Sequence, residues 1–542
     1  MPAGPAAHRR QRPRAPPRAA RRSQDSRQAA GRRPPARANL PNLPNLPNPP
    51  NPLNLLNLLN PLNLLNPPNP SIILSPMFPH PRPTRRGFLA RLAGAAAAVR
   101  WLRDGSGALG AFSRPIPSTS QLEWQRDEFA LFTHFGMNTF TDREWGDGKE
   151  PPSIFAPSAL DTRQWAKAAR VAGAKTMILT AKHHDGFCLW PTKTTEHSVA
   201  KSPWRNGRGD VVREFVDACR AEGLKPGLYL SPWDRHEPRY GDSPRYNDFY
   251  CDQLTELLTR YGPIQEVWFD GAPGATDPQG VGPNGQRQQY DWPRIWQLVR
   301  RLQPKAVMFS DAGPDIRWIG NENGTAGDPN WSTVDPAVVK VPGAGGPGVT
   351  RMLQNGDPAG TAWRPGEADV SIRPGWFHHA KEDARVKSVD QLVDLYFASV
   401  GRNSKLLLNV PPTKEGRLHE TDVARLSGLR DRLSGTFHTD LAAKRAARWQ
   451  IASTRAAAVE IDLGRPVSIS IVDLGEDITH GQLVVHYTVE GREGQDWKTL
   501  KRGNTVGCRK LDRFTPVTVS AVRVSITEAL DTPRPLRVGV YA

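Results

Sequence analysis

From about Gln121 onward, two hydrophobic patterns alternate along the chain. Uninterrupted apolar runs rich in β-branched and aromatic residues predict buried strands, whereas apolar residues that recur every three or four positions predict amphipathic helices. The expected strands lie within residues 129–140, 174–187, 224–234, 264–271 and 306–313. The expected helices lie within residues 159–173, 209–223, 243–262 and 290–304. Each of these helices opens near Ser, Asp or Pro, as helix N-termini do.

The alternation of strands and helices predicts the architecture. Strands that are apolar throughout are covered on both faces, so they pair in parallel and carry helices outside them. The later part is less regular: residues 323–350 indicate a long glycine-rich loop, and a helix, a strand and a second helix follow at 388–405, 406–412 and 420–437. We therefore expect an α/β fold with a (β/α)8-like (TIM-type) barrel over residues 121–440.

A different pattern begins at about Ala442. Apolar and polar residues alternate singly in several short segments, and this period of two is typical of antiparallel strands with one buried face. We expect a C-terminal β-sandwich over residues 442–542. It could bind carbohydrate or could pack on the barrel and stabilise it. The second role is favoured, because Trp449 and Trp497 are the only tryptophans in this part of the sequence.

The N-terminal part lacks such periodicity. Residues 1–76 combine an arginine-rich segment with a Leu/Pro/Asn tract whose prolines interrupt any helix, so we expect a disordered low-complexity extension. Residues 77–115 place Arg85 and Arg86 before an alanine-rich apolar stretch too short to span a bilayer stably. This resembles a twin-arginine export signal and implies a periplasmic or extracellular location. Because Met77 stands shortly before these arginines, a misassigned start upstream is a further hypothesis.

Composition changes this picture in two respects. The 542-residue chain has a formal net charge of +18, but 18 arginines and two aspartates place +16 of it before residue 123. Nucleic-acid binding needs a basic face on a folded domain, so we expect no nucleic-acid partner. The four cysteines show no CxxC spacing, which indicates neither a structural zinc site nor a disulfide framework. They are Cys188, Cys219, Cys251 and Cys508.

Polar and aromatic residues follow the ends of successive expected strands. The clearest is Asp270 in WFDG, where an apolar run stops at an aspartate although an unpaired buried carboxylate is costly. The C-terminal strand ends form the active-site face of such barrels, so Asp270 is expected at the mouth. The same face would gather His134, His183, His184, Asp185, Tyr229, Trp233, Asp234, Trp268 and Asp311. Any one of them could be structural, but together they predict a functional site.

Two chemistries suit this set of residues. In one, the histidines and the aspartate of HHD hold zinc or a similar ion for a metal-dependent hydrolase. In the other, two carboxyl groups hydrolyse a glycosidic bond while histidines and aromatic rings hold the sugar. The 16 tryptophans favour the second chemistry, because flat aromatic faces suit the apolar faces of sugar rings. The first stays open as an alternative.

Six segments between about residues 123 and 412 carry a family resemblance. They are FALFTHFGMNTF, KHHDGFCLWPTKTTEHSV, GLYLSPWDRH, EVWFDGA, FSDAGPDIRWIGNENG and EADVSIRPGWFHH. In these segments the chain resembles the α-L-fucosidases of glycoside hydrolase family twenty-nine. GPDIRWIGNE and VSIRPGWF are similar to the branch of that family that prefers α-1,3/1,4 linkages. The resemblance implies a retaining enzyme that releases α-linked L-fucose through a covalent glycosyl-enzyme.

The resemblance also implies roles for individual residues. Asp270 takes the nucleophile role, and Glu322 in WIGNE takes the acid/base role, for which Glu367 is the rival. Implied substrate-binding residues are His134, Glu144, Trp145, His183, His184, Tyr229, Trp268 and Trp376. No metal and no cofactor is expected, and the expected partner is a fucosylated oligosaccharide or glycoconjugate. No stable membrane span is expected, and the oligomeric state stays open.

A non-catalytic carbohydrate-binding relative is the second alternative to the hydrolase. Such a relative has no need of the two reactive carboxyl groups. Because Asp270 and Glu322 are both present, the hydrolase is favoured.

Overall fold

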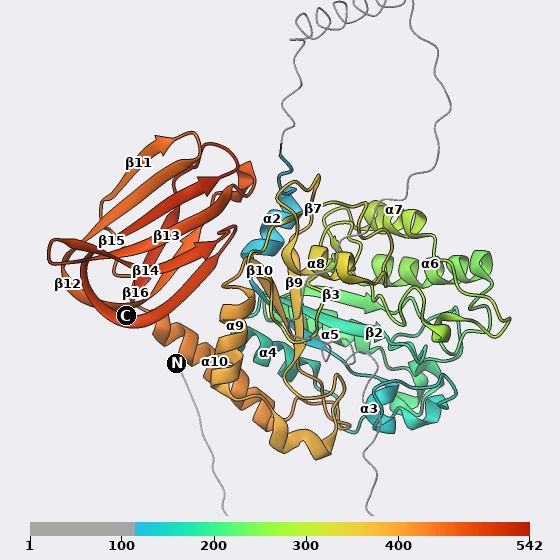
Figure 1. Ribbon diagram of the computed structural model, residues 1–542. Coiled ribbons are helices and arrows are strands. Elements are labelled where there is room, and N and C mark those ends of the chain that lie inside the picture. The colour runs from blue at the N-terminus through green and yellow to red at the C-terminus, as the bar shows by residue number, and fades with distance from the viewer. Residues whose placement is uncertain (1–113) are drawn as a thin grey trace, which may run out of the picture. The chain divides into compact units, whose positions relative to one another are not determined.

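The computed structural model describes residues 114–542, and Figure 1 shows its helices and strands. The expected extension of residues 1–76 and nearly all of the expected signal of residues 77–115 lie outside the described residues. Nothing in the structure therefore bears on either prediction.

Eight parallel strands form one sheet that closes almost completely into a barrel. Its strand order is β5-β4-β3-β2-β1-β10-β9-β6. A parallel bridge between Phe309 and Ile316 links the two end strands across the remaining gap. The strands are β1 Phe129–Thr133, β2 Thr176–Lys182, β3 Lys225–Leu230, β4 Glu266–Trp268, β5 Val307–Phe309, β6 Arg317–Trp318, β9 Gly366–Ser371 and β10 Ser404–Asn409. The expected α/β barrel is confirmed.

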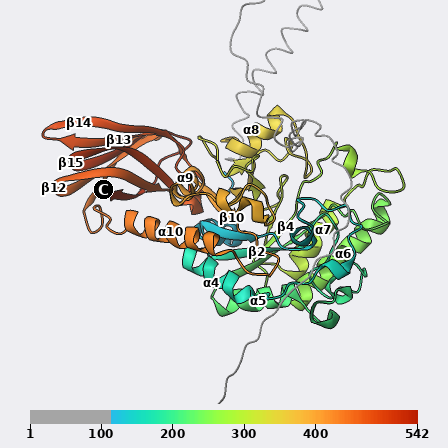
Figure 2. The same cartoon turned by 90° about the horizontal axis from the view of Figure 1, so that it is seen from below.

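Helices cover the outside of the barrel, as Figures 1 and 2 show from two directions. The α-helices are α2 Thr119–Arg126, α3 Met137–Thr141, α4 Thr162–Ala172, α5 Val211–Ala221, α6 Ser243–Arg260, α7 Trp292–Leu302, α8 Pro347–Asn355, α9 Val389–Ser399 and α10 Glu420–Thr436. Short 3₁₀ turns are η2 Pro152–Ile154, η3 Val199–Lys201, η4 Trp204–Gly207, η5 Pro278–Gly280, η6 Ala380–Arg385 and η7 Ile478–His480.

Local chemistry explains where these helices begin and end. The Asp161 carboxylate accepts a hydrogen bond from the main-chain N–H of Gln164 at the start of α4, and Gly173 ends this helix in the left-handed conformation, with φ of 94°. Asp210 caps α5 in the same way through the N–H of Arg213. The sequence-based expectation of helix starts near Ser, Asp or Pro is confirmed at these positions.

Two expectations of secondary structure were wrong in part. The apolar segment 129–140 is a strand only to Thr133, and Met137–Thr141 forms the short helix α3. The expected loop of residues 323–350 contains the short strand β7 Thr333–Val334, which pairs antiparallel with β8 Ala362–Trp363. Helix α8 already begins at Pro347, because a proline lacking an N–H fits the first turn of a helix.

The barrel strands have a different apolar core on each face. Ala130 and Phe132 of β1 pack inside the barrel with Tyr229 and Trp268. The alternate residue Leu131 packs outside, in the cluster that the helices share. Side chains of a strand alternate between its two faces, so a strand that is buried on both sides must be apolar throughout.

The C-terminal part forms an antiparallel β domain. Its strands are β11 Ala447–Ser453, β12 Ala456–Gly475, β13 Val484–Glu493, β14 Asp496–Asn504, β15 Lys510–Ala529 and β16 Arg537–Tyr541. They form one hydrogen-bonded sheet, in the order β11-β12-β15-β13-β14 with β16 beside β12. The register of β12 against β15 shifts between Asp462 and Val467, and such irregularities bend strands. The bent sheet encloses a hydrophobic core separate from that of the barrel.

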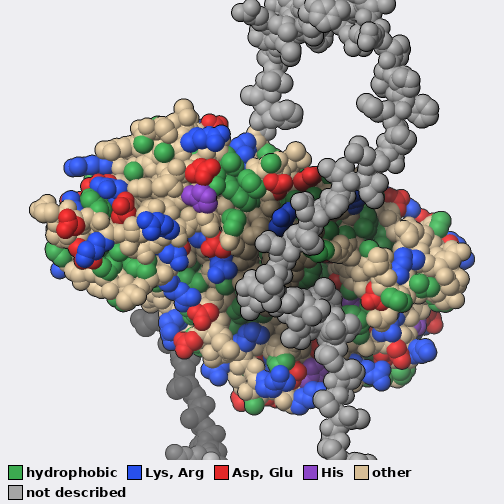
Figure 3. Space-filling model, in the orientation of Figure 1, with side chains coloured by type: hydrophobic (Ala, Val, Ile, Leu, Met, Phe, Trp, Pro, Cys, Tyr) green, Lys and Arg blue, Asp and Glu red, His purple; other side chains and the backbone are tan. Residues whose placement is uncertain are grey.

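The described surface carries charges of both signs. On the face seen in Figure 3, Lys and Arg side chains are interspersed with Asp and Glu over both the barrel and the C-terminal sheet. Within residues 114–542, none of the helices combines the length and the apolar composition needed to cross a membrane. All four cysteines are free thiols, and three of them are buried.

Candidate active site

The C-terminal ends of the barrel strands bring expected site residues together. His134 directly follows β1, and His183 and His184 directly follow β2. Tyr229 is the last residue but one of β3, and Asp270 stands two residues after β4. The His134 and Tyr229 rings lie 6.1 Å apart between centroids, and the His134 and His183 rings 5.6 Å apart. Parallel strands that end at one face thus build one mouth from distant parts of the sequence.

The carboxylate of Asp270 is held on both oxygens. The Tyr229 hydroxyl donates a hydrogen bond to Oδ2 over 3.0 Å, and the main-chain N–H of Ala272 donates to Oδ1 over 2.7 Å. Burial, followed by the nearby charge of Asp270, raises the pKa of Tyr229, so the phenol stays a donor. The Asp270 side chain is still 24% exposed. This carboxylate is therefore both oriented and accessible from the mouth.

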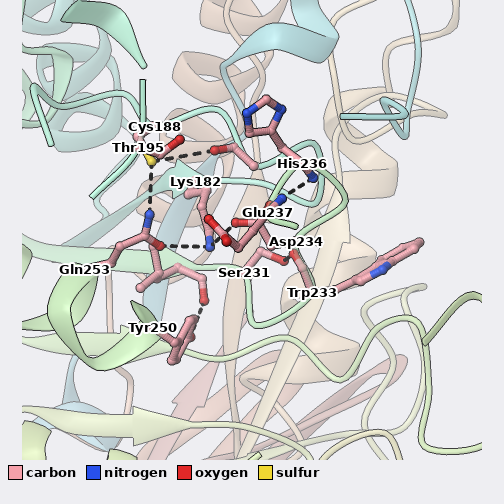
Figure 4. A network of polar contacts seen from close by, with 12 residues as sticks. Lys182, Cys188, Thr195, Ser231, Trp233, Asp234, His236, Glu237, Tyr250 and Gln253 are labelled. Carbon is pink, nitrogen blue, oxygen red and sulfur yellow. Dashed lines mark hydrogen bonds and ion pairs between the residues drawn. The ribbon is translucent and has the colours of Figure 1, made fainter. Parts of the chain in front are cut away.

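A bulge at the end of β2 sets the direction of the residues that follow. The register of β2 against β3 shifts between Thr180 and Lys182, which turns Lys182 outward, between β3 and α6. There its ammonium group donates to Asp234 Oδ2 and to Gln253 Oε1, each over 2.9 Å, as Figure 4 shows. Both members of the ion pair are almost fully buried. The buried pair ties the end of β2 to the loop after β3 and thereby fixes the position of His184.

His184 presents an unprotonated nitrogen to the mouth. Its Nδ1 lies 2.7 Å from Ser231 Oγ, and Ser231 donates its own proton to the carbonyl oxygen of Trp233. Ser231 must then accept from Nδ1–H, which leaves Nε2 as an acceptor 3.7 Å from Asp270 Oδ2. Burial lowers the pKa of His184 to about 4, so the ring is neutral at pH 7. The half-buried Trp145 ring meets the His184 ring edge-on, with 5.7 Å between centroids.

His183 presents the opposite hydrogen-bonding character. The side-chain amide of Asn138 donates to the main-chain oxygen of Glu144, which identifies its nitrogen, and the same nitrogen lies 3.2 Å from His183 Nδ1. Nδ1 of His183 is therefore an acceptor, and Nε2 carries the proton. Burial, followed by the neighbouring His184, lowers the pKa of His183. The mouth thus combines nitrogen donors and acceptors, which suits an array of hydroxyl groups.

Glu322 approaches the mouth from the loop that follows β6. The indole N–H of Trp376 donates to its Oε2 over 3.3 Å. The Glu322 side chain is exposed at the surface, although nearby protein atoms partly desolvate its carboxyl group. This partial desolvation, together with the charges of Asp270 and Glu144, raises the pKa of Glu322 to about 7, although the bond from Trp376 acts in the opposite direction. A carboxyl group of this kind can carry a proton near neutral pH.

Glu144 and Trp376 are also brought together, but mainly through the main chain of Trp376. The Glu144 carboxylate accepts from the N–H of Trp376 over 2.8 Å, from the N–H of Phe377 over 3.2 Å and from His379 Nε2 over 2.6 Å. A Cβ at Gly375 would collide with Glu144 Oε1, which favours glycine at this position of the RPGW turn. The hydrogen bonds of the Glu144 carboxylate thus go to the segment that contains Trp376.

Trp268 and Glu367 lie inside the barrel. The Trp268 ring stacks on Phe309 with 4.2 Å between centroids, and its indole N–H donates to Glu367 Oε1 over 3.0 Å. Glu367 is the second residue of β9 and has no exposed surface. Burial, followed by the charge of Glu266, raises the pKa of Glu367 far above its usual range. The rival glutamate is therefore enclosed, and Glu322 is the carboxyl group at the mouth.

The structure adds buried polar residues that the sequence analysis did not single out. Asp369 in β9 accepts from the indole N–H of Trp318 over 2.7 Å, and burial, followed by the charge of Glu322, raises its pKa. Asn138 orients His183, and Asn409 contacts His134. Asn409 is the polar residue at the end of the apolar run LLLN, just as Asp270 follows an apolar run. This pattern could have identified Asn409 as a site residue from the sequence.

The HHD segment does not gather its side chains around one point. His183 and His184 are engaged with Asn138 and Ser231, and Asp185 is almost fully buried and accepts from the N–H of Phe187. Within residues 114–542, no group of three His, Cys, Asp or Glu side chains is arranged to hold a metal ion.

Comparisons with known proteins agree with a carbohydrate-active site. The family model described as "Alpha-L-fucosidase" matches residues 110–434. Alpha-L-fucosidase 1 of Arabidopsis thaliana is 42% identical over 457 residues, which cover 79% of this chain and 87% of that protein. The chain thus resembles a characterised family over most of its described length.

Solved structures resemble the fold as well. A glycoside hydrolase 29 family member from an unknown rumen bacterium has a TM-score of 0.72 and 41% identity, covering 79% of this chain and 77% of its own. A Ruminococcus gnavus family 29 fucosidase solved in complex with fucose has a TM-score of 0.72 and 32% identity, covering 80% of this chain and 97% of its own.

Proposed function

Because the chain belongs to the α-L-fucosidase family of glycoside hydrolases, we propose that it is a retaining enzyme that prefers α-1,3- and α-1,4-linked L-fucose. Family membership supports the release of fucose from glycans, and it favours this function over the metal-dependent and non-catalytic alternatives. The observation that carries the mechanism is the pairing at one mouth of Asp270, held by Tyr229, with Glu322, held by Trp376.

In the first step Asp270 attacks the anomeric carbon of the fucosyl group. The bond from this carbon to the leaving oxygen breaks, and the proton of Glu322 moves to that oxygen. The product is a fucosyl ester of Asp270 and a free alcohol. In the second step Glu322, now ionised, removes a proton from water as the water attacks the same carbon and releases Asp270. Two inversions give net retention, and the carboxyl groups of such enzymes stand about 5 to 5.5 Å apart.

The surroundings of the two carboxyl groups support this division of roles. Asp270 receives two hydrogen bonds and remains accessible, as a nucleophile requires. Partial desolvation and the Asp270 charge raise the pKa of Glu322 to about 7, so a substantial fraction of Glu322 holds a proton at neutral pH and nearly all of it at acidic pH. Different environments for two neighbouring carboxyl groups are how such enzymes separate acid from nucleophile.

The histidines supply the recognition of the sugar in this proposal. His184 offers a nitrogen lone pair and His183 offers an N–H, so they can bind neighbouring hydroxyl groups of one ring as acceptor and donor. Tyr229 and Trp145 complete the wall beside them. The R. gnavus relative solved with fucose makes fucose the sugar to test in this position.

Trapping with azide tests the roles of the two carboxyl groups. Glu322→Ala, given an aryl α-L-fucoside with a good leaving group, should form the fucosyl-enzyme and yield α-L-fucosyl azide when azide attacks it. Asp270→Ala should yield β-L-fucosyl azide, because azide then attacks the substrate directly and inverts it once. The reverse pattern would exchange the two roles. In the wild type, proton NMR should show α-L-fucose as the first product.

Competing substrates test the linkage preference. The segments GPDIRWIGNE and VSIRPGWF, which carry the resemblance to the α-1,3/1,4 branch, contribute Glu322 and Trp376, and these two side chains touch. The wild type should release fucose from an α-1,3- or α-1,4-fucosylated trisaccharide with a kcat/KM at least about tenfold above that for an α-1,2-fucosylated one, about 1.4 kcal/mol. Equal rates would contradict the preference while leaving the fucosidase activity intact.

Export by the twin-arginine route is a separate proposal, and it rests on Arg85, Arg86 and the alanine-rich apolar stretch that follows them. Cell fractionation tests it. The wild type should be found in the periplasm or the medium, and Arg85→Lys/Arg86→Lys should remain in the cytoplasm. Equal distribution of both proteins would contradict it.

A further inference from the structure

Asn409 stands at the end of β10 with no exposed surface, and its side-chain amide forms four hydrogen bonds. Its Oδ1 accepts from the main-chain N–H of His134 over 3.3 Å and lies 2.9 Å from His134 Nδ1. Its Nδ2 donates to Trp376 O over 2.8 Å and to Ser371 Oγ over 2.9 Å. The amide thus uses all of its ordinary hydrogen-bonding capacity on three segments of the mouth.

The partners determine which end of the amide is oxygen and which is nitrogen. The main-chain N–H of His134 can only donate, so it needs the oxygen, and the carbonyl of Trp376 can only accept, so it needs the nitrogen. His134 Nδ1 faces the oxygen and must therefore carry a proton. In the neutral ring Nε2 is then a lone-pair acceptor. Burial lowers the pKa of His134 to about 4, which keeps the ring neutral at pH 7.

The other end of the amide acts on the segment that contacts Glu322. Asn409 binds the carbonyl of Trp376, while Glu144 binds the N–H of the same residue over 2.8 Å. The main chain of Trp376 is thus held on both sides. Its indole N–H is the group that donates to Glu322. One buried amide therefore connects a histidine of the mouth with the support of the carboxyl group that we assign as the acid.

We propose that Asn409 is a positioning residue that sets the tautomer of His134 for accepting a sugar hydroxyl and holds Trp376 against Glu322. The inference deepens the proposed function and rests on it only for the roles of His134 and Glu322. The hydrogen-bond pattern that defines the tautomer stands without it. Asn409 touches no reacting atom itself, so its effects must appear through its two neighbours.

Asn409→Asp is the sharpest test, because it keeps the size of the side chain and replaces both donors with a negatively charged acceptor oxygen. The carboxylate would repel Trp376 O and would favour the protonated form of His134. The other charged or titratable groups around His134 are Glu144, Asp270, His183, His184 and Tyr229, and the substitution leaves all of them in place. A protonated His134 cannot accept from the sugar, so activity should begin only at higher pH than in the wild type.

The expected result is a loss of at least about tenfold in kcat/KM and an acidic limb of the pH profile displaced upward. Loosening Trp376 should also impair proton donation by Glu322. The loss of kcat should then be greater for an oligosaccharide, whose leaving group needs protonation, than for an aryl fucoside with a good leaving group. If Asn409→Asp had the same pH profile and the same dependence on the leaving group as the wild type, the proposal would be overturned.

The matched control is Asn247→Asp. Asn247 is a buried asparagine of α6 that donates to the main-chain oxygen of Gln289 over 2.9 Å. This change removes a comparable amide donor and should lower thermal stability without moving the pH profile. If it moved the profile as Asn409→Asp does, the shift would reflect general loosening of the fold and the proposal would fail.

A second measurement depends neither on activity nor on the folding of an Asn409 variant. In the wild-type full chain labelled with ¹⁵N-histidine, and with the His134 signals assigned by comparison with His134→Gln, Nδ1 should be the protonated nitrogen. A proton on Nε2 would overturn the inference even if the enzyme releases fucose. A wild type that releases no fucose while showing the expected tautomer would instead refute the proposed function.

Discussion

At the scale of single residues, burial acts on neighbouring carboxyl groups to different degrees. Asp369 is enclosed and pairs with an indole N–H, whereas the side chain of Glu322 reaches the surface and is only partly desolvated. Protonation state follows from these surroundings, since removal of water penalises the charged form. Glu322 is the one whose pKa, about 7, lies in the range of a working acid.

The pH dependence of kcat/KM should report this acid. Because the protonated form of Glu322 is the active one, activity should fall as the pH rises through about 7. Trp376→Phe removes a hydrogen bond that favours the ionised form of Glu322. The alkaline limb of the pH–rate profile should therefore move to higher pH, by less than about one pH unit. The pH–rate profiles of both proteins check this. A limb that stays in place or moves downward would contradict the role of Trp376.

The buried pair of Lys182 and Asp234 should matter greatly for stability. Burial alone would raise the pKa of Asp234, but Lys182 and two main-chain N–H groups lower it. Lys182→Met leaves that carboxylate buried without its cation and should lower the free energy of unfolding by about 3 to 5 kcal/mol in urea titrations. Lys201→Met breaks an exposed pair with Glu196 and should cost less than about 1 kcal/mol. Similar losses in both variants would be evidence against the tight pairing.

At the scale of elements, the turn that carries Asp270 depends on close contact between two glycine-containing segments. A Cβ at Gly271 would lie 2.5 Å from Asp311 Oδ2 and 2.8 Å from the nitrogen of Gly343. The same carboxylate of Asp311 accepts from the N–H of Gly343 over 2.8 Å. The glycine-rich segment before α8 is therefore packed against the turn beside Asp270.

Gly271→Ala should displace this turn and with it the carboxylate of Asp270. A shift of about 1 Å at a reacting group can lower the rate on the order of 100-fold, so we expect kcat to fall by about 10- to 100-fold. Gly345→Ala is the control, since a Cβ at Gly345 meets nothing within 4 Å. Steady-state kinetics of the two variants check the prediction. A kcat for Gly271→Ala equal to that of the control would show that the turn tolerates the methyl group.

At the scale of the whole molecule, the C-terminal sheet is joined to the barrel by buried polar contacts. Arg509 donates to Glu128 Oε2, next to β1, over 2.7 Å and to Asp473 Oδ2 of β12 over 2.9 Å. Asn403, next to β10, donates to Gln482 over 3.2 Å and accepts from the N–H of Cys508 over 2.7 Å. These contacts support the structural role of the C-terminal domain that the sequence analysis favoured.

Arg509→Met should therefore destabilise the molecule as a whole. It removes the guanidinium that links the buried Asp473 to the partly buried Glu128, and among the described residues only Arg537 and the Tyr396 hydroxyl would still donate to these two carboxylates. We expect a cost of about 1 to 3 kcal/mol in the free energy of unfolding. Arg513→Met removes an exposed ion pair with Asp394 on α9 and should cost less than about 1 kcal/mol. Calorimetry of both variants checks this, and an unchanged melting temperature for Arg509→Met would argue for independent domains.

The sequence by itself determined most elements of the protein and the residues at the strand ends, but it did not predict the barrel strands β6 and β9. Apolar runs predict the fold class, because parallel strands that are buried on both faces need apolar residues throughout. The polar residues at which these runs stop, such as Asp270, predict the position of the mouth. The mistakes of this method were local. Residues 137–141 continue an apolar run but form a helix, since hydrophobicity alone does not separate a strand from the turn after it.

Only the tertiary structure decided which carboxyl group is enclosed and which nitrogen of each histidine is free. Glu367 and Glu322 are both glutamates in segments that carry the family resemblance, yet one is buried against Trp268 and the other touches Trp376 at the mouth. The hydrogen-bond partner of His134 is Asn409, which lies 275 positions away in the sequence. Protonation and orientation depend on desolvation and on partners brought together by the barrel, and neither property is encoded in local sequence pattern.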